Sequence, residues 1–258
     1  MTPYQTWISF FTIVRKDILR MLRVWPQTFL PSIVTSCLYF LIFGAFLGSR
    51  IGDVHGVPYV MFVVPGLVML AVVTNAYANT SFVMFSSKFF GRTIDEILVS
   101  PTPPWVLVTG YVTGGVVRGV AIGTLVLLVS LFFTKLVVTN IFIVFLFLIL
   151  TSLVFSLAGL VNGVYAKSID GINIVPTFIL TPLVYLGGVF YSAQSLPGSW
   201  GSVTRFDPIF YIINGFRYGF LGIADTPLWF STAVLCSLAL ILLLAAWYLI
   251  KTGLGLRQ

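Results

Sequence analysis

The sequence predicts an all-α integral membrane protein with six transmembrane helices. Only 8% of its 258 residues are charged and 59% are hydrophobic, whereas a soluble domain is about a quarter charged and just under half apolar. Charge-free stretches of about 18 residues or more, the length that crosses a bilayer, recur along the chain. With 14 basic and 7 acidic residues, the chain cannot be a soluble globular enzyme, a disordered chain or a nucleic-acid-binding protein.

Residues 4–25 precede the spans and have the pattern of an amphipathic interfacial helix. At about 100° per residue, one line of the helix is apolar; it carries Trp7, Phe11, Val14, Ile18, Met21 and Trp25. Lys16, Arg20 and Arg23 fall on the opposite side. We therefore expect residues 1–28 to form a cytoplasmic interface helix, which anchors the chain at the membrane surface and can also present its basic face to a cytosolic protein.

Six spans are expected in residues 29–258. Trimmed at glycine, proline and aromatic borders, they lie near 29–47, 58–84, 105–133, 140–165, 172–191 and 228–250. With the N-terminus inside, nine Lys and Arg residues fall on the inner side and four on the outer side, if Arg118 is left out as intramembrane. Because cytoplasmic loops carry the excess of basic residues, we expect both termini in the cytoplasm.

Two connecting segments have patterns of their own. In the inner loop from Lys88 to Pro104, Thr93 can cap a short helix that has Glu96 at its third position. That helix is either a capped connector or a rigid lever that another protein pushes. The outer segment 205–227 is too polar to span, and Asp207 followed by Pro208 is a helix start. We expect one or two re-entrant half-helices there, buried in protein or lining a cavity.

Polar side chains inside the spans are few. Asn75 and Asn79 lie one turn apart in span two, and Thr181 and Tyr185 lie one turn apart in span five. Arg118 lies among the glycines of span three, where burial of its charge costs roughly 2.5–3.5 kcal/mol unless it has a partner or a wet cavity. Each of these is either an interhelical hydrogen bond or part of a pathway wall.

Motifs for catalysis are missing. The single histidine, His55, excludes a His-based triad and a His-x3-His zinc site. The sequence has no G-x-x-x-x-G-K-[ST] phosphate-binding loop. All seven acidic residues lie at or beyond the span ends, which disfavours a proton- or sodium-coupled carrier. We expect no enzymatic activity, no metal site and no cofactor in this chain.

Three local motifs complete the pattern: Val64-Pro65-Gly66-Leu67 in span two, Arg92 with Glu96-Ile97-Leu98-Val99-Ser100-Pro101 after it, and Asp207-Pro208 with Phe216-Arg217-Tyr218-Gly219-Phe220-Leu221-Gly222 before the last span. Their order and spacing, over essentially the whole chain, resemble the ABC-2 type exporter permeases, although Asn-Pro is the commoner start of that last segment. The closest resemblance is to small bacterial permeases of the multidrug-export type.

The resemblance implies a half-transporter: a homodimer of this chain in the bacterial inner membrane, surrounded by lipids, with two cytosolic ABC ATPase subunits that bind ATP and Mg²⁺. It places ATPase coupling on Arg92, Asp95, Glu96 and Pro101 of the loop and on Lys16 and Arg20 of the first helix. It makes Asn75, Asn79, Thr181, Tyr185 and Arg118 candidates for the substrate pathway, and Asp207, Phe216 and Arg217 candidates for an outer gate.

The function so implied is the transmembrane permease subunit of an ATP-driven exporter. Its substrate would be hydrophobic, lipid-like or glycan-type, moved out of the cytoplasm or the inner leaflet. Two alternatives stay open: a membrane scaffold or assembly protein that transports nothing, and an ion-coupled secondary carrier. An adjacent reading frame encoding a soluble protein with a Walker A sequence would favour the exporter.

Overall fold

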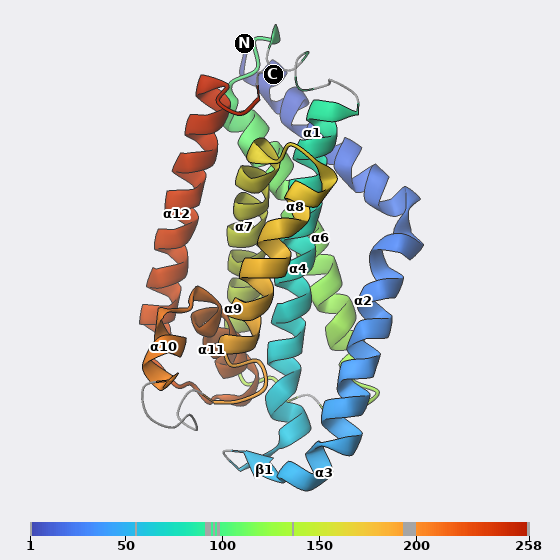
Figure 1. Cartoon of the computed structure of the whole chain (residues 1–258), viewed down its shortest axis with the longest axis vertical. Helices are drawn as coiled ribbons and strands as arrows, with labels where there is room; N and C mark the ends of the chain where they lie inside the picture. The colour runs from blue at the N-terminus through green and yellow to red at the C-terminus, as the bar shows by residue number, and fades with distance from the viewer. Residues whose placement is uncertain are drawn as a thin grey trace.

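The computed structural model describes residues 2–54, 56–90, 94, 96, 99–135, 137–192 and 200–256. These residues form an elongated bundle of helices, with the N- and C-termini at the same end (Figure 1). We call this the terminal end. The opposite end carries a two-stranded antiparallel hairpin, β1 (Asp53–Val54) with β2 (Val57–Pro58), and we call it the hairpin end.

Six helical segments in the described part of the chain are long and apolar enough to cross a membrane, as the sequence predicted. They are Trp25–Gly44, which covers α2 (Trp25–Tyr39) and part of the wider turn η1 (Phe40–Phe46), α4 (Tyr59–Phe89), α6 (Pro104–Ser130), α7 (Ile141–Tyr165), the segment Ile169–Leu186, and α12 (Leu228–Thr252). The predicted spans differ from these bounds by only a few residues at either end.

Helix α4 is the centre of the bundle. It is apolar on nearly all sides, the pattern of a helix surrounded by protein, and 67% of its most apolar window is buried. Helices α6 and α7 pack closely on it because glycines remove the intervening side chains. A Cβ at Gly119 of α6 would come within 2.6 Å of Ser152 on α7, and one at Gly123 within 2.7 Å of Val72 on α4. The glycine spacing in span three thus serves packing.

Helix α1 (Pro3–Arg23) begins at a capping box formed by Thr2 and Gln5. As expected, Trp7 and Phe11 are exposed. Of the basic face predicted for this helix, Arg20 turns inward and bonds Asn79 of α4, and Asp17 beside it is buried against α4 and α6. Helix α2 begins at Trp25, so the first helix ends earlier than residue 28.

The fifth span is not one regular helix. It consists of α8 (Ile169–Val175), a wider turn η2 (Pro176–Leu180) and α9 (Thr181–Leu186). The Thr181 hydroxyl donates to the carbonyl of Pro176, five residues earlier, at 2.9 Å. Pro176 and Pro182 have no N–H to donate, so the regular ladder is interrupted here. The fifth span is therefore interrupted by a widened turn between its two short helices.

Short helices at the hairpin end precede the last span, where re-entrant half-helices were predicted. They are α10 (Trp200–Phe206) and α11 (Pro208–Leu221), and a further short helix, α3 (Gly48–Ile51), precedes β1. The 14 residues of α11 reach about 21 Å, too short to span. A side chain at Gly215 would collide with the ring of Phe147 on α7, so α11 is buried in protein, as irregular membrane backbone must be.

The loop between α4 and α6 is described only in part. Arg92, Thr93 and Asp95 lie outside the described residues. Ile94 is buried among residues of α4, α6 and α7, whereas Glu96 is exposed. The amide of Ser100 donates to the carbonyl of Glu96 at 3.1 Å, a helical bond that ends just before Pro101.

Candidate functional site

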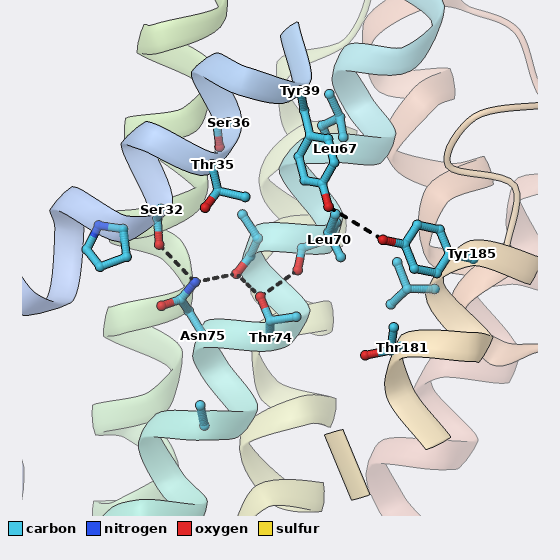
Figure 2. Close-up of a pocket in the computed structure, with 14 residues that line it drawn as sticks. Ser32, Thr35, Ser36, Tyr39, Leu67, Leu70, Thr74, Asn75, Thr181 and Tyr185 are labelled. Carbon is cyan, nitrogen blue, oxygen red and sulfur yellow. Dashed lines mark hydrogen bonds between the residues drawn. The ribbon is translucent and has the colours of Figure 1, made fainter. Parts of the chain in front are cut away.

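A groove of about 430 Å³ runs between α2, α4 and α9, the first, second and fifth spans (Figure 2). None of its fourteen described lining residues is charged. Eight of them carry hydroxyl or amide groups: Ser32, Thr35, Ser36, Tyr39, Thr74, Asn75, Thr181 and Tyr185. The groove can therefore accept an uncharged group by hydrogen bonds and by aromatic contact.

Hydrogen bonds within the groove fix part of its wall. Asn75 Nδ2 donates to Ser32 Oγ at 3.2 Å and to the carbonyl of Ala71 at 3.0 Å, which joins α2 to α4. The Thr74 hydroxyl donates to the carbonyl of Leu70 at 2.8 Å. Thr181 is occupied in the same way by its bond within span five. These side chains are consequently oriented before any ligand binds.

Aromatic rings close the groove toward the hairpin end. The hydroxyls of Tyr39 and Tyr185 lie 3.5 Å apart across it (Figure 2). The ring of Phe190 stacks on Phe43 at 4.2 Å and on Tyr185 at 5.9 Å between centroids. Tyr59 OH donates to the Phe190 carbonyl at 3.0 Å. This aromatic group ties the segment after α9 to α2 and α4.

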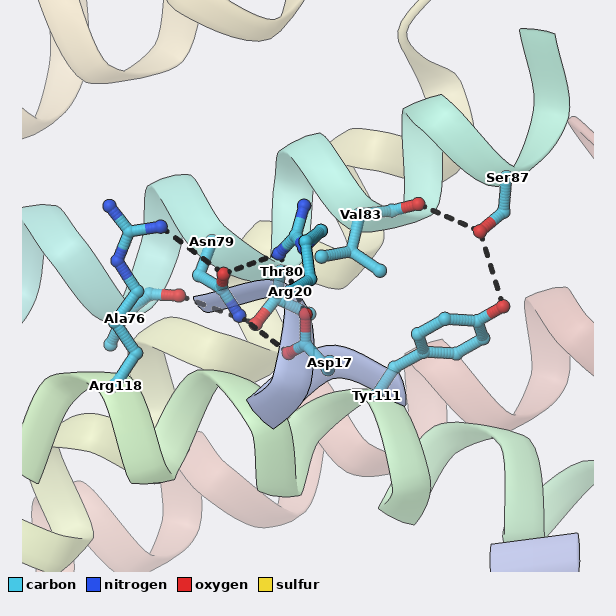
Figure 3. A network of polar contacts seen from close by, with 9 residues as sticks. All are labelled: Asp17, Arg20, Ala76, Asn79, Thr80, Val83, Ser87, Tyr111 and Arg118. Carbon is cyan, nitrogen blue, oxygen red and sulfur yellow. Dashed lines mark hydrogen bonds and ion pairs between the residues drawn. The ribbon is translucent and has the colours of Figure 1, made fainter. Parts of the chain in front are cut away.

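A second polar site, which we call the arginine cluster, lies where α1, α4 and α6 meet (Figure 3). It consists of Asp17, Arg20, Asn79 and Arg118. The Asp17 carboxylate accepts from Arg20 Nη2 at 2.7 Å and from Asn79 Nδ2 at 2.9 Å. Asn79 Oδ1 accepts from Arg20 Nη2 at 2.7 Å and from Arg118 Nη1 at 3.3 Å. A side chain at Gly114 would collide with the Asp17 carboxylate, so this glycine makes room for the cluster.

The predicted gate residues are buried at the hairpin end. Arg217 of α11 donates from Nη2 to the carbonyl of Gly188 at 2.8 Å, and its guanidinium lies 3.9 Å from the ring centroid of Phe62 on α4. Phe216 is fully buried beside it. Arg217 thus holds the segment that follows α9 against the core.

Asp207 caps α11, as its position before Pro208 predicted. Its Oδ1 accepts from the amide of Ile209 at 2.8 Å, whereas Oδ2 is buried without a hydrogen-bond partner among the described residues. Desolvation raises the pKa of this carboxyl from 3.8 to about 7, against the opposing effect of the Ile209 amide.

The structure brings together only part of the predicted pathway. Asn75, Thr181 and Tyr185 line the groove, but Asn79 and Arg118 are not among its lining residues and belong to the arginine cluster. Arg20 joins that cluster, whereas Lys16 stays exposed. Arg92 and Asp95 of the predicted coupling loop lie outside the described residues.

Sequence reasoning missed Asp17 and the hydroxyl groups of α2. A signal for Asp17 existed: it is the only acid in a basic helix, and Gly114 offers a gap in span three. Ser32, Thr35 and Ser36 recur along one side of span one, but short hydroxyl side chains in spans also bond their own backbone, so the pattern alone does not indicate a groove.

Comparison of the sequence with known proteins identifies the family of this chain. A family model described as ABC-2 type transporter matches residues 8–221. The inner membrane transport permease YadH of Escherichia coli K12 is 51% identical over 252 residues, which cover 98% of each chain. Nodulation protein J of Rhizobium meliloti is 24% identical over 93% of this chain and 91% of its own.

Proposed function

The chain belongs to the ABC-2 type transporter family and is a multi-pass inner-membrane permease, and from this premise we propose that it is the transmembrane subunit of an ATP-driven exporter. The family implies association with ATPase subunits. In this proposal two copies of the chain pair, two separate cytosolic subunits bind and hydrolyse ATP with Mg²⁺, and this chain supplies the pathway.

The groove is the observation that carries the proposal. It opens between the two least buried spans, Trp25–Gly44 and Ile169–Leu186. In each of these spans, only 17% of the most apolar window is buried inside the protein. Several of the hydroxyl and amide groups of the groove already bond within the protein, but the donors and acceptors that they leave unused would find no partner in lipid, which is costly in hydrocarbon. A second copy that covers this face encloses the groove instead, and the two grooves together form a central cavity.

The proposed substrate is an amphiphile with hydrophobic, lipid-like or glycan-type character. Uncharged hydroxyl, amide and tyrosine side chains line the groove together with Leu67, Leu70 and Val184. Such a mixture suits a ligand with both apolar and hydroxyl-bearing parts. Release toward the hairpin end requires the rings of Tyr39, Tyr185 and Phe190 to separate. Arg217, next to Phe216 on the helix that Asp207 caps, holds the segment that carries Phe190 by its bond to Gly188.

We place the terminal end in the cytoplasm on the basis of the nine-to-four distribution of basic residues. The ATPase then meets the loop with Arg92, Asp95, Glu96 and Pro101 and the exposed Lys16 of α1. Arg20 acts differently in this proposal: through Asn79 it links α1 to α4. Movement of α1 by the ATPase is thereby transmitted to the helix that forms the groove wall.

One observation bears on the ion-coupled alternative. Asp17 is a buried carboxylate, which the sequence analysis did not anticipate. Both of its oxygens are bonded, one to a guanidinium at 2.7 Å and one to an amide at 2.9 Å. Both oxygens are thus already engaged by protein donors, an arrangement that suits a structural link between helices better than the binding site of a coupling ion.

Co-purification tests the exporter proposal. The chain is co-expressed with soluble ABC ATPases from the same genome, extracted in mild detergent and weighed by native mass spectrometry. We expect a complex of two permease chains and two ATPase subunits whose ATP hydrolysis exceeds that of the ATPase alone. A permease that carries no ATPase, and does not change its hydrolysis, would contradict the proposal.

A further inference from the structure

The arginine cluster has an unbalanced charge. It contains two guanidiniums, Arg20 and Arg118, and one carboxylate, Asp17. No other carboxylate pairs with either guanidinium among the described residues. Arg118 is the less satisfied of the two: its bonds to Asn79 and Asn75 are 3.3 and 3.5 Å long, and its Nε is buried with no partner in the described part of the chain. A net positive charge therefore remains within the protein.

This charge lies at the terminal end of the groove. Asn75 connects the two sites, since it lines the groove and its Oδ1 accepts from Arg118 Nη2. Ala78, at the same end of the groove lining, is exposed and one residue before Asn79. The side chain of Arg20 is 35% exposed. Its guanidinium lies 5.7 Å from the ring centroid of Phe82, which is one turn beyond Ala78 on α4. The groove is thus uncharged along its length and electropositive where it ends.

The depth of the cluster matches a membrane boundary. Helix α4 has 31 residues, or about 46 Å, which exceeds a hydrocarbon core of about 30 Å by roughly 16 Å. Asn79 lies ten residues before the end of α4, about 15 Å from it. With the excess length at the terminal end, Asn79 and Arg20 lie near the boundary of the hydrocarbon, and Arg118, 14 residues after Pro104 in the 27-residue α6, reaches toward them from deeper in the bundle.

We propose that Arg118, together with Arg20, binds the oxyanion of an anionic amphiphile, a phosphate or carboxylate group, while the uncharged part of the same molecule occupies the groove. The inference rests on the proposed export function for the identity of the ligand as substrate. The physical reason is charge compensation: an uncompensated guanidinium at a membrane boundary is stabilised by an anion, and its planar donors fit two oxygens at once. Asn75 and Asn79 orient the guanidinium.

Lipid binding to the full-length chain tests the site without the ATPase. The chain is placed in nanodiscs of dioleoylphosphatidylcholine with increasing dioleoylphosphatidylglycerol, and bound anionic lipid is counted by native mass spectrometry. We expect Arg118→Gln to weaken phosphatidylglycerol binding at least about tenfold, as expected for loss of a charge-assisted contact. Arg15→Gln is the matched control, since it removes the same charge from the exposed surface of α1, and it should change binding by less than about twofold.

Three outcomes would overturn the proposal: equal binding by wild type and Arg118→Gln, equal losses in Arg118→Gln and Arg15→Gln, or no preference for phosphatidylglycerol over phosphatidylcholine. A parallel titration with inorganic phosphate separates the two sources of the anion. Phosphate that only weakly displaces the lipid supports an amphiphile. Inorganic phosphate that binds as tightly as the lipid overturns the proposal that the ligand is an amphiphile.

A second measurement does not depend on the folding of an Arg118 variant. In a background with Cys37→Ser and Cys236→Ser, a cysteine is introduced as Ala78→Cys and modified with an anionic or a cationic methanethiosulfonate reagent. A positive local potential predicts that the anionic reagent gains at least about threefold over the cationic one, relative to their ratio on a free thiol. Equal relative rates would overturn the site.

The two proposals fail separately. Loss of anion binding together with intact ATPase coupling would reject the anion site and keep the exporter. Specific anion binding by a chain that associates with no ATPase would keep the site and reject the exporter.

Discussion

Asn75 and Asn79 lie one turn apart on α4, yet their surroundings differ. Asn75 lines the groove and donates to Ser32, whereas Asn79 is 2% exposed and bonded to Asp17, Arg20 and Arg118. Two asparagines one helical turn apart therefore have different roles. Asn75 forms part of the groove wall, whereas Asn79 is the centre of a buried hydrogen-bond network. The sequence shows the spacing but not which neighbouring helix each residue meets.

Leucine substitutions separate these two roles. We expect Asn79→Leu to lower the unfolding midpoint, because it leaves buried charged groups without a partner, at a cost of about 1–3 kcal/mol. Asn75→Leu is the matched variant; because its bonds to Ser32 and Arg118 are longer, at 3.2 and 3.5 Å, it should lower the unfolding midpoint less than Asn79→Leu but change the basal ATPase rate of the complex. Thermal unfolding and ATPase rate are measured on the same samples. A stable Asn79→Leu beside an unstable Asn75→Leu would contradict this assignment.

Asp207 predicts a pH-dependent stability. Its pKa in the folded protein is raised from 3.8 to about 7 by burial, so the fold favours the protonated form. The contribution of the Asp207 carboxyl to the free energy of unfolding is then fully present below about pH 4 and declines as the pH rises toward 7. Above pH 7 this contribution no longer changes. Asp207→Asn keeps the cap on α11 but cannot ionise. The unfolding midpoint of this variant relative to that of the wild type should therefore increase as the pH rises from about 4 to about 7.

The size of the Asp207 effect is measurable by scanning fluorimetry at several pH values. A difference of 1 kcal/mol shifts the midpoint by about 2–4 °C in a chain of roughly this length. Asp53→Asn, at an exposed position of the hairpin, is the control and should show no such trend. A midpoint difference for Asp207→Asn that is the same at pH 4 and pH 8 would reject the titration of Asp207.

At the scale of elements, hydrophobic runs were enough to predict all six spans, because a membrane imposes length and apolarity on each span separately. The capped α11 was equally local, since Asp207 and Pro208 adjoin in sequence. The apolar line through Trp7 and Phe11 faces outward as expected. The inward contacts of Asp17 and Arg20 with α4 were not foreseen, because periodicity shows which side of a helix is polar but not which neighbouring helix that side meets.

The site was predictable to the same extent. Asn75, Thr181 and Tyr185 were found because polar groups stand out in apolar spans. The groove they share also needs Ser32 and Tyr39, and its aromatic end needs Phe190, which follows α9 and adjoins another aromatic residue, Tyr191. Only the packing of α2 and α9 against the oppositely directed α4 brings these together, and that packing is a property of the folded chain.

The loop after α4 carries the prediction on coupling. Ile94 is buried in the core while Glu96 is exposed two residues later, so the segment is anchored and presents a charge outward. We expect Glu96→Ala to reduce the stimulation of ATP hydrolysis severalfold without affecting membrane insertion, because a lever transmits force only through its contacts. Asp53→Ala removes a charge at the hairpin end and should leave stimulation intact. If Glu96→Ala leaves the stimulation of ATP hydrolysis unchanged, Glu96 does not couple the permease to the ATPase.

For the whole molecule, orientation follows from the basic residues. In a background without Cys37 and Cys236, we expect Asp53→Cys at the hairpin end to react with an impermeant maleimide on intact spheroplasts. Thr252→Cys, exposed at the terminal end, should react only after lysis. The reverse pattern would place the loop with Glu96 outside and remove the basis for ATPase coupling.

Pairing of two chains is the last consequence of the groove. A twofold axis beside α2 brings equivalent residues of the two copies together, so Val34 and Leu38, 54% and 55% exposed on α2, should lie near their counterparts. Ile241 on α12 is as apolar and 62% exposed, but α12 lies on the far side of the bundle from α2 (Figure 1).

In the background without native cysteines, Leu38→Cys should therefore form a cross-linked dimer with a short bis-maleimide, and Ile241→Cys should remain monomeric on denaturing gels. Both positions are apolar and face outward, so random collisions in the membrane would cross-link them equally. Cross-linking at Ile241→Cys alone would move the partner to α12, and the polar groove between α2, α4 and α9 would then face lipid without a covering chain.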